Sequence, residues 1–125
     1  MDVSRIFDAL NDPQREAVGA PPGPMLVLAG AGSGKTRVLT YRIAYLVQAL
    51  EVSPYSILAV TFTNKAANEM RKRIEGFLGF SVRGMWIGTF HGLSHRILRD
   101  HHELARLPKG FEILDSDDQY RVIRR

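Results

Sequence analysis

Residues 25–36 read Met-Leu-Val-Leu-Ala-Gly-Ala-Gly-Ser-Gly-Lys-Thr, and this stretch decides the fold. An apolar run, a glycine-rich turn and a Lys-Thr pair that opens a helix are the parts of a phosphate-binding loop. The turn directs backbone N–H groups at one point, and the helix that follows adds the positive end of its dipole there. Lys35 is placed to reach the β- and γ-phosphates, and the Thr36 hydroxyl is placed to ligate Mg²⁺.

The loop departs from the strict motif at its first position, where Ala29 replaces a glycine. The remaining glycines still permit positive φ angles and a close approach to a phosphate. An ordinary glycine-rich turn with an incidental lysine is the alternative, and the strand and helix signals on either side argue against it. The predicted phosphate-binding residues are Ala29, Gly30, Ala31, Gly32, Ser33, Gly34, Lys35 and Thr36.

The composition, 45% hydrophobic and 24% charged, is that of a globular chain. A length of 125 residues corresponds to one domain or part of one. There is no cysteine, so disulfides and thiolate metal sites are excluded. No apolar run approaches the ~20 residues of a membrane span, and no signal-peptide pattern is present. We therefore expect a cytoplasmic protein.

The charge balance is basic, with a net charge of +4 and a pI of 9.8. Residues 64–109 hold nine Lys/Arg and four Asp/Glu. A basic surplus beside a nucleotide loop suggests a polyanion such as nucleic acid, although a solvated helix face gives the same count.

Apolar strands alternate with amphipathic helices, which predicts an α/β fold with a parallel sheet. Both Met25–Ala29 and Ile57–Thr61 are apolar enough to be buried on both faces. Asn64 is expected to cap a helix that Gly79 ends. The expected elements are a helix starting at 11–13, strand 25–29, helix 35–50, strand 57–61, helix 64–78, strand 85–88, helix 90–102 and a helix from 116.

Ligands of such sheets bind where the strands end, so the segments after Leu28, Val60 and Ile87 should form one continuous site. Phe62 is suited to stack on a base, and Thr63, Asn64 and Lys65 to contact phosphates. The alternative places Phe62 in the core and leaves Asn64 as a cap only.

The segment after the third predicted strand supplies Thr89, Phe90 and His91. His91 could contact a phosphate or a base, or it could be structural. Its spacing to the other histidines, without an acidic residue in the metalloprotease position, does not favour a metal site. Gln14, at the start of the first long helix, has the donor and acceptor that suit the edge of adenine, although a surface Gln usually does nothing specific.

Four segments together resemble the motifs of superfamily 1 DNA helicases of the UvrD/Rep/PcrA group. Residues 10–18, LNDPQREAV, resemble the adenine-recognising Q motif. LAGAGSGKTRVL at 28–39 looks like motif I, AVTFTNKAANEMRKRI at 59–74 like motif Ia, and WIGTFHGLSHRILR at 86–99 like motif Ib. Their order and spacing agree along the whole chain, with the UvrD branch as the nearest match.

The resemblance implies a P-loop NTPase with a partial RecA-like parallel sheet flanked by helices. Residues 1–90 would be the N-terminal part of the first motor domain, and 91–125 the start of an inserted helical subdomain. It implies ATP and Mg²⁺ as cofactors and single-stranded and duplex DNA as partners, in 3′-to-5′ unwinding during repair and replication. By the same resemblance, Gln14 and Arg37 contact the nucleotide, and Phe62, Thr63, Asn64, Thr89, Phe90 and His91 line the path of single-stranded DNA.

The family's Walker B carboxylates, an Asp-Glu pair after a further apolar strand, do not occur in these residues. We therefore expect the N-terminal part of a longer helicase, which alone binds nucleotide and DNA weakly without turnover. Unpaired strand edges lead us to expect self-association. Two other functions stay open. One is a small-molecule kinase, which would not explain the segments at 61–67 and 88–91, and the other is a non-enzymatic nucleotide- or DNA-binding module.

Overall fold

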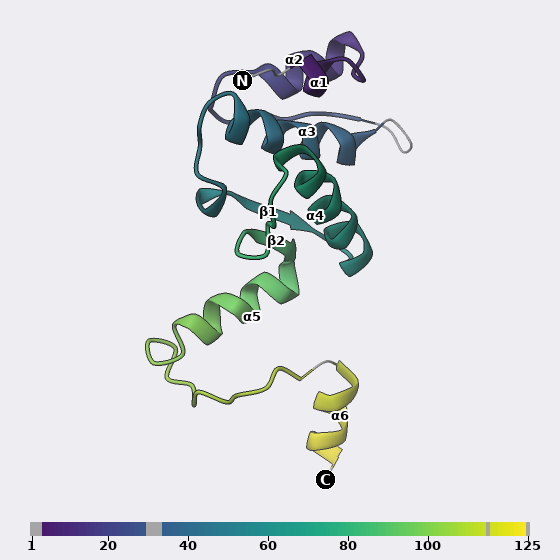
Figure 1. Ribbon diagram of the computed structural model, residues 1–125. Coiled ribbons are helices and arrows are strands. Elements are labelled where there is room, and N and C mark those ends of the chain that lie inside the picture. Colours follow the sequence, from purple (N-terminus) through teal and green to yellow (C-terminus); the bar gives the residue numbers. More distant parts are fainter. Residues whose placement is uncertain (1–3, 30–33, 115, 125) are drawn as a thin grey trace. The chain divides into compact units, whose positions relative to one another are not determined.

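The computed structural model describes residues 4–29, 34–114 and 116–124, which form two compact units, Met1–Thr89 and Phe90–Arg125 (Figure 1). The fold is mixed α/β, as predicted. In the first unit the elements are α1 (Ser4–Phe7), α2 (Asp12–Gly19), α3 (Lys35–Gln48), the 3₁₀ turn η1 (Pro54–Ser56), β1 (Leu58–Thr61), α4 (Asn64–Leu78) and β2 (Trp86–Thr89). The second unit contains α5 (Phe90–Asp100) and α6 (Ser116–Arg124).

The sheet consists of two parallel strands, β1 and β2, joined by α4. Their register places Leu58 beside Trp86 and Thr61 beside Thr89. Both strands therefore end at the same edge, as the sequence predicts. This edge positions the segment that follows Thr61 next to Thr89.

The predicted strand Met25–Ala29 is wrong. Residues 24–29 form no strand, and Leu26 and Leu28 are 82% and 88% exposed. An apolar run becomes a strand only when a neighbouring strand completes its hydrogen bonds, and β1 and β2 pair with each other. Met25 and Val27 instead line a cavity of about 280 Å³ with residues of α3.

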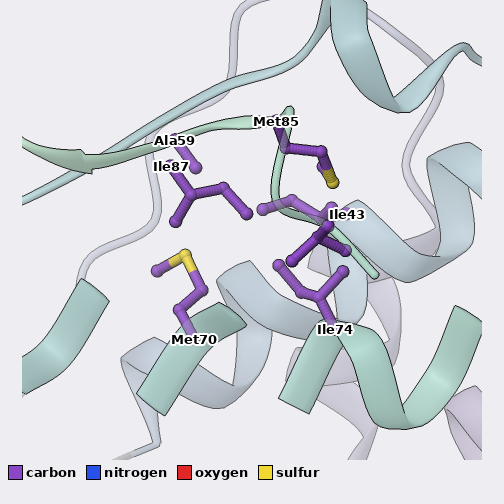
Figure 2. Close-up of a cluster of buried hydrophobic side chains, with 7 residues drawn as sticks. Ile43, Ala59, Met70, Ile74, Met85 and Ile87 are labelled. Atoms are coloured by element: carbon purple, nitrogen blue, oxygen red, sulfur yellow. The ribbon is translucent and has the colours of Figure 1, made fainter. Parts of the chain in front are cut away.

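The prediction that the strand at 57–61 is buried on both faces is also wrong, because Leu58 is 59% exposed. One face of the sheet is covered by α4, and α3 packs against α4 in turn. Figure 2 shows the side chains that meet there. This cluster consists of Ile43, Ala59, Met70, Ile74, Val82, Met85 and Ile87.

A second apolar cluster holds α1 and α2 against α3. It is built from Ile6, Leu10, Val18 and Ala44, all of them buried. Burying the side chains of Ile6, Leu10 and Val18 stabilises the fold by about 1.5–3 kcal/mol each. The cluster fixes where α2 lies, and α2 carries Gln14 towards the start of α3.

Local signals set most helix ends. Asn11 caps α2 with a capping box, and Gly79, with φ +75°, ends α4 as predicted. The predicted cap of α4 is one residue off, because the Thr63 side chain accepts the hydrogen bond from the Ala66 N–H and Asn64 is the first helical residue. Either side chain can cap a helix, and the extended backbone at Thr63 decides between them.

Candidate functional site

A cavity of about 580 Å³ opens at the beginning of α3. It brings together residues from three helices that are distant in sequence. They are Gln14 from α2, Gly34, Lys35, Thr36 and Arg37 at the start of α3, and Ala66, Glu69 and Arg73 from α4. Five residues predicted to bind a nucleotide therefore lie in one cavity.

The structure describes Ala29 and Gly34 on either side of the predicted loop. The predicted residues Gly30, Ala31, Gly32 and Ser33 fall outside the described residues. Ala29 lines a neighbouring cavity of about 300 Å³, which shares Gln14 and Lys35 with the first.

The first turn of α3 is open to an anion. Gly34 precedes it with φ +83° and supplies no side-chain cap, whereas Asn11 caps α2 and Thr63 caps α4. The first N–H groups of a helix have no partner within the helix, and here they face a cavity that contains the exposed Lys35. A phosphate group fits this combination of backbone donors, helix dipole and ammonium.

Gln14 reaches this helix end with its amide nitrogen. The Gln14 Oε1 accepts from the backbone N–H of Asn11 at 3.0 Å, and the backbone N–H of Gln14 donates to Asn11 Oδ1 at 3.0 Å. Its Nε2 lies 3.0 Å from the point where a Cβ on Gly34 would stand. The capping box thus orients the amide, and the Nε2 donor is the end that lies beside Gly34.

Two arginines of α3 form hydrogen bonds with backbone carbonyls of the α1–α2 region. Arg37 Nη1 donates to the Ala9 carbonyl at 3.3 Å. Arg42 donates to the carbonyls of Val18 and Ala20 and, at 3.4 Å, to that of Pro21. These carbonyls lie at the end of α2, so Arg42 anchors the helix that carries Gln14.

Sequence reasoning missed Glu69 and Arg73, which also line the cavity. Their spacing from Ala66 puts all three on one face of α4, while Ala67, Met70 and Ile74 are buried. Helical periodicity applied to residues 64–78 could have found this second face.

The residues fit a magnesium ion that arrives with a nucleotide. Mg²⁺ usually takes one or two protein oxygen ligands and completes its shell with phosphates and water. Thr36 is exposed at the cavity, and its carbonyl accepts from the Thr40 hydroxyl at 2.8 Å within the helix. Among the described residues no group of three or more His, Cys, Asp or Glu could hold a metal by itself.

The residues predicted to contact nucleic acid lie outside this cavity, at the ends of the strands. Phe62 is 89% exposed, which excludes the alternative that it packs in the core. Thr63 and Asn64 are exposed as well, and the Thr61 hydroxyl donates to the Thr63 carbonyl at 3.1 Å. Thr89, half-buried, pairs with Thr61 across the sheet.

Phe90 and His91 belong to the second unit, at the start of α5. Phe90 is 57% exposed and His91 is exposed. Their side chains are accessible, as a role in ligand binding requires.

The sequence model of the UvrD/REP helicase N-terminal domain matches residues 10–125. The chain belongs to the UvrD/REP helicase family. It is 66% identical over 125 residues to DNA helicase II of Salmonella typhimurium and 65% to that of Escherichia coli, covering 100% of this chain and 17% of each relative. It is 50% identical over 121 residues to the ATP-dependent DNA helicase PcrA of Bacillus subtilis, covering 97% of this chain and 16% of that protein.

The chain therefore corresponds to the N-terminal domain of UvrD/REP helicases and spans about a sixth of the length of these relatives. The family domain is a P-loop, RecA-like fold, which agrees with the α/β architecture and the open first turn of α3. In the described part of the chain, none of the helices has the length and apolar character needed to cross a membrane.

Proposed function

We propose that this chain is the N-terminal ATP-binding part of an ATP-dependent DNA helicase that moves 3′ to 5′ on single-stranded DNA. In this proposal the helicase unwinds duplex DNA during repair and replication. Family membership and the names of the relatives support this proposal. The observation that carries it is the cavity at the open end of α3, where Lys35 and Thr36 are exposed and Gln14 lies against Gly34.

In this proposal residues 1–90 are part of the first RecA-like motor domain, and 91–125 begin an inserted helical subdomain. The parallel pair β1–β2 with its crossover helix supports the first assignment. The helical character of α5 and α6 supports the second.

The cavity binds ATP through complementary chemistry. The first-turn N–H groups of α3 and Lys35 hold the phosphates, the Thr36 hydroxyl ligates Mg²⁺, and Gln14 Nε2 donates to an acceptor on adenine. Arg37 and Arg73 add positive charge to the cavity wall. Magnesium, when bound, neutralises part of the phosphate charge.

In the first unit, single-stranded DNA binds at the edge where β1 and β2 end, with Phe62 as an aromatic surface for a base and Thr63, Asn64 and Thr89 as polar contacts to the backbone. In the second unit, Phe90 supplies an aromatic surface and His91 a polar contact. In the whole helicase, ATP binding and hydrolysis would change the affinity for this DNA strand.

Titration calorimetry with Mg·ATP tests the nucleotide site. We expect weak binding that Lys35→Ala reduces about tenfold or more, because a charged hydrogen bond to phosphate is lost. Lys72→Ala removes a charge from the exposed side of α4, outside the cavity, and should leave the affinity unchanged. Equal affinities for the Lys35 variant and the unmodified chain would refute the site.

Phosphate release with Mg·ATP and single-stranded DNA tests whether the 125 residues also catalyse. We expect no steady release, because hydrolysis needs a residue that orients the water and cations that stabilise the transferred phosphoryl group. Turnover that disappears in Lys35→Ala would mean that this chain already contains the water-orienting residue.

A further inference from the structure

A second cavity, of about 380 Å³, lies beside the nucleotide cavity in the first unit. We call it the arginine groove. Its lining residues are Arg5 from α1, Arg37 and Tyr41 from α3, and Arg73, Gly76 and Phe77 from α4. It shares Arg37 and Arg73 with the nucleotide cavity and contains neither Lys35 nor Gln14.

The groove carries three guanidinium groups, and the nearest carboxylate that shares a cavity with two of them is Glu69, one helical turn from Arg73. Among the described residues the structure gives no carboxylate within ion-pair distance of Arg5, Arg37 or Arg73, and the ion pair that it does give joins Arg15 to Asp12. Arg5 and Arg73 are exposed, so their guanidinium groups are available to a ligand. Guanidinium groups bind phosphate oxygens in pairs, which makes an arginine cluster suited to a phosphate group.

The floor of the groove is aromatic. The rings of Tyr41 and Phe77 meet edge to face, with centroids 4.7 Å apart, and both are half-buried against the cluster that contains Ile6 and Ala44. Gly76 also lines the groove, and a Cβ there would have no atom within 4 Å. Aromatic lining of this kind offers a base an apolar surface for stacked or edge-to-face contact.

We infer that the arginine groove is a second ligand site, for a nucleoside monophosphate whose base lies on Tyr41 and Phe77 and whose phosphate lies among the three arginines. Its volume is within the ~300–1,000 Å³ usual for small-molecule sites. The groove lies at the C-terminal end of α4, whereas Phe62 and Asn64 lie at its N-terminal end, so it is separate from the proposed DNA edge. Because two arginines are shared, an anion in the groove weakens the binding of another in the nucleotide cavity, and the effect is reciprocal.

Titration calorimetry of the 125-residue chain with AMP tests this inference. Gly76→Leu fills the groove without altering a charge, and leucine is a good helix former at this exposed position. We expect AMP affinity to fall about tenfold or more in Gly76→Leu and in Arg5→Ala, since each loses contacts made in the groove. Lys72→Ala, on the same helix outside both cavities, should have no effect.

Gln14→Ala separates the groove from the nucleotide cavity, because Gln14 lines only the latter of the two. AMP binding that falls in Gln14→Ala and stays unchanged in Gly76→Leu and Arg5→Ala overturns the inference and leaves the proposed ATP site intact. If circular dichroism shows that Gly76→Leu has lost helix, the AMP affinity of Arg5→Ala alone decides whether the groove binds AMP. Pyrophosphate that binds as tightly as AMP, with the same sensitivity to Arg5→Ala, would overturn the assignment of a nucleoside.

Discussion

The amide nitrogen of Gln14 lies 3.0 Å from the point where a Cβ on Gly34 would stand. Gln14 is held there by its capping box with Asn11, and Gly34 takes φ +83° as it leads into α3. The residue expected to contact a base thus occupies the space that a side chain at position 34 would need. A change at either one is expected to affect both stability and nucleotide binding.

Gly34→Ala should lower the free energy of unfolding by about 1–2 kcal/mol, because the left-handed backbone conformation at this position is unfavourable by that amount for a residue with a Cβ. It should also weaken ATP binding, because the new methyl group displaces Gln14 Nε2. Urea denaturation and calorimetry measure the two effects. Gly76→Ala, in open space within α4, is the matched control and should instead stabilise by about 0.5–1 kcal/mol. Equal stability changes in the two variants would contradict the strain at Gly34.

Gln14→Glu should abolish the preference for ATP over GTP while stability stays near that of the unmodified chain. Glutamate at this position keeps the acceptor that the Asn11 N–H needs, but it lacks the amide donor. Gln14→Ala should lose both the preference and about 0.5–1 kcal/mol of stability, because the Asn11 N–H loses its acceptor while Asn11 still caps α2. The ratio of the two nucleotide affinities is the measurement, since the added charge of glutamate lowers both. A ratio that persists in Gln14→Glu would show that another group selects the base.

Phe62→Ala should weaken single-stranded DNA binding by about 1–3 kcal/mol, the contribution of one stacked base. Its effect on stability should stay within about 0.5 kcal/mol, because the side chain is exposed. Titration of a labelled oligonucleotide at several salt concentrations measures both affinity and the number of phosphates contacted. Leu58→Ala, at the other end of β1, is the control. Identical affinities for the two variants would remove Phe62 from the DNA edge.

Arg42→Ala should destabilise the first unit by about 1–3 kcal/mol, because the part-buried hydrogen bonds to the carbonyls of Val18 and Ala20 lose their donor. Arg42→Lys should recover only part of this, since an ammonium lacks the planar fork that spans several carbonyls. Both variants should also reduce the preference for ATP over GTP, because α2 positions Gln14. Thermal and urea unfolding check the prediction. A variant as stable as the unmodified chain would mean that the apolar cluster alone holds α2.

The chain should self-associate at micromolar concentrations through residues 25–28. Leu26 and Leu28 are almost fully exposed, and this extended segment has no strand beside it among the described residues. An unpaired apolar segment of this kind can pair with another chain. Sedimentation equilibrium should show a monomer in the double variant Leu26→Lys and Leu28→Lys. The variant Leu104→Lys, at an exposed site in the second unit, should associate as before. A monomeric unmodified chain would refute this expectation.

Signals that act within a few residues were sufficient for much of the fold. The sequence alone predicted the end of α4 at Leu78 and its start to within one residue, because a polar cap and a glycine in the left-handed region act at its two ends. It also predicted a helix start within residues 11–13, where α2 begins at Asp12, and the start of α3 at Lys35. The exposure of Phe62, in contrast, had two open interpretations, because burial depends on what else packs nearby.

Sequence by itself determined the family, the α/β class and the identity of Gln14, Lys35 and Thr36 as candidate nucleotide ligands, since local motifs specify them. Only the tertiary structure decided that residues 24–29 form no strand, because a strand exists through its neighbour and not through its own composition. It also decided that Glu69 and Arg73 join Gln14 in one cavity. Those contacts arise from the packing of α2, α3 and α4, and the apolar clusters that fix this packing join residues far apart in the chain.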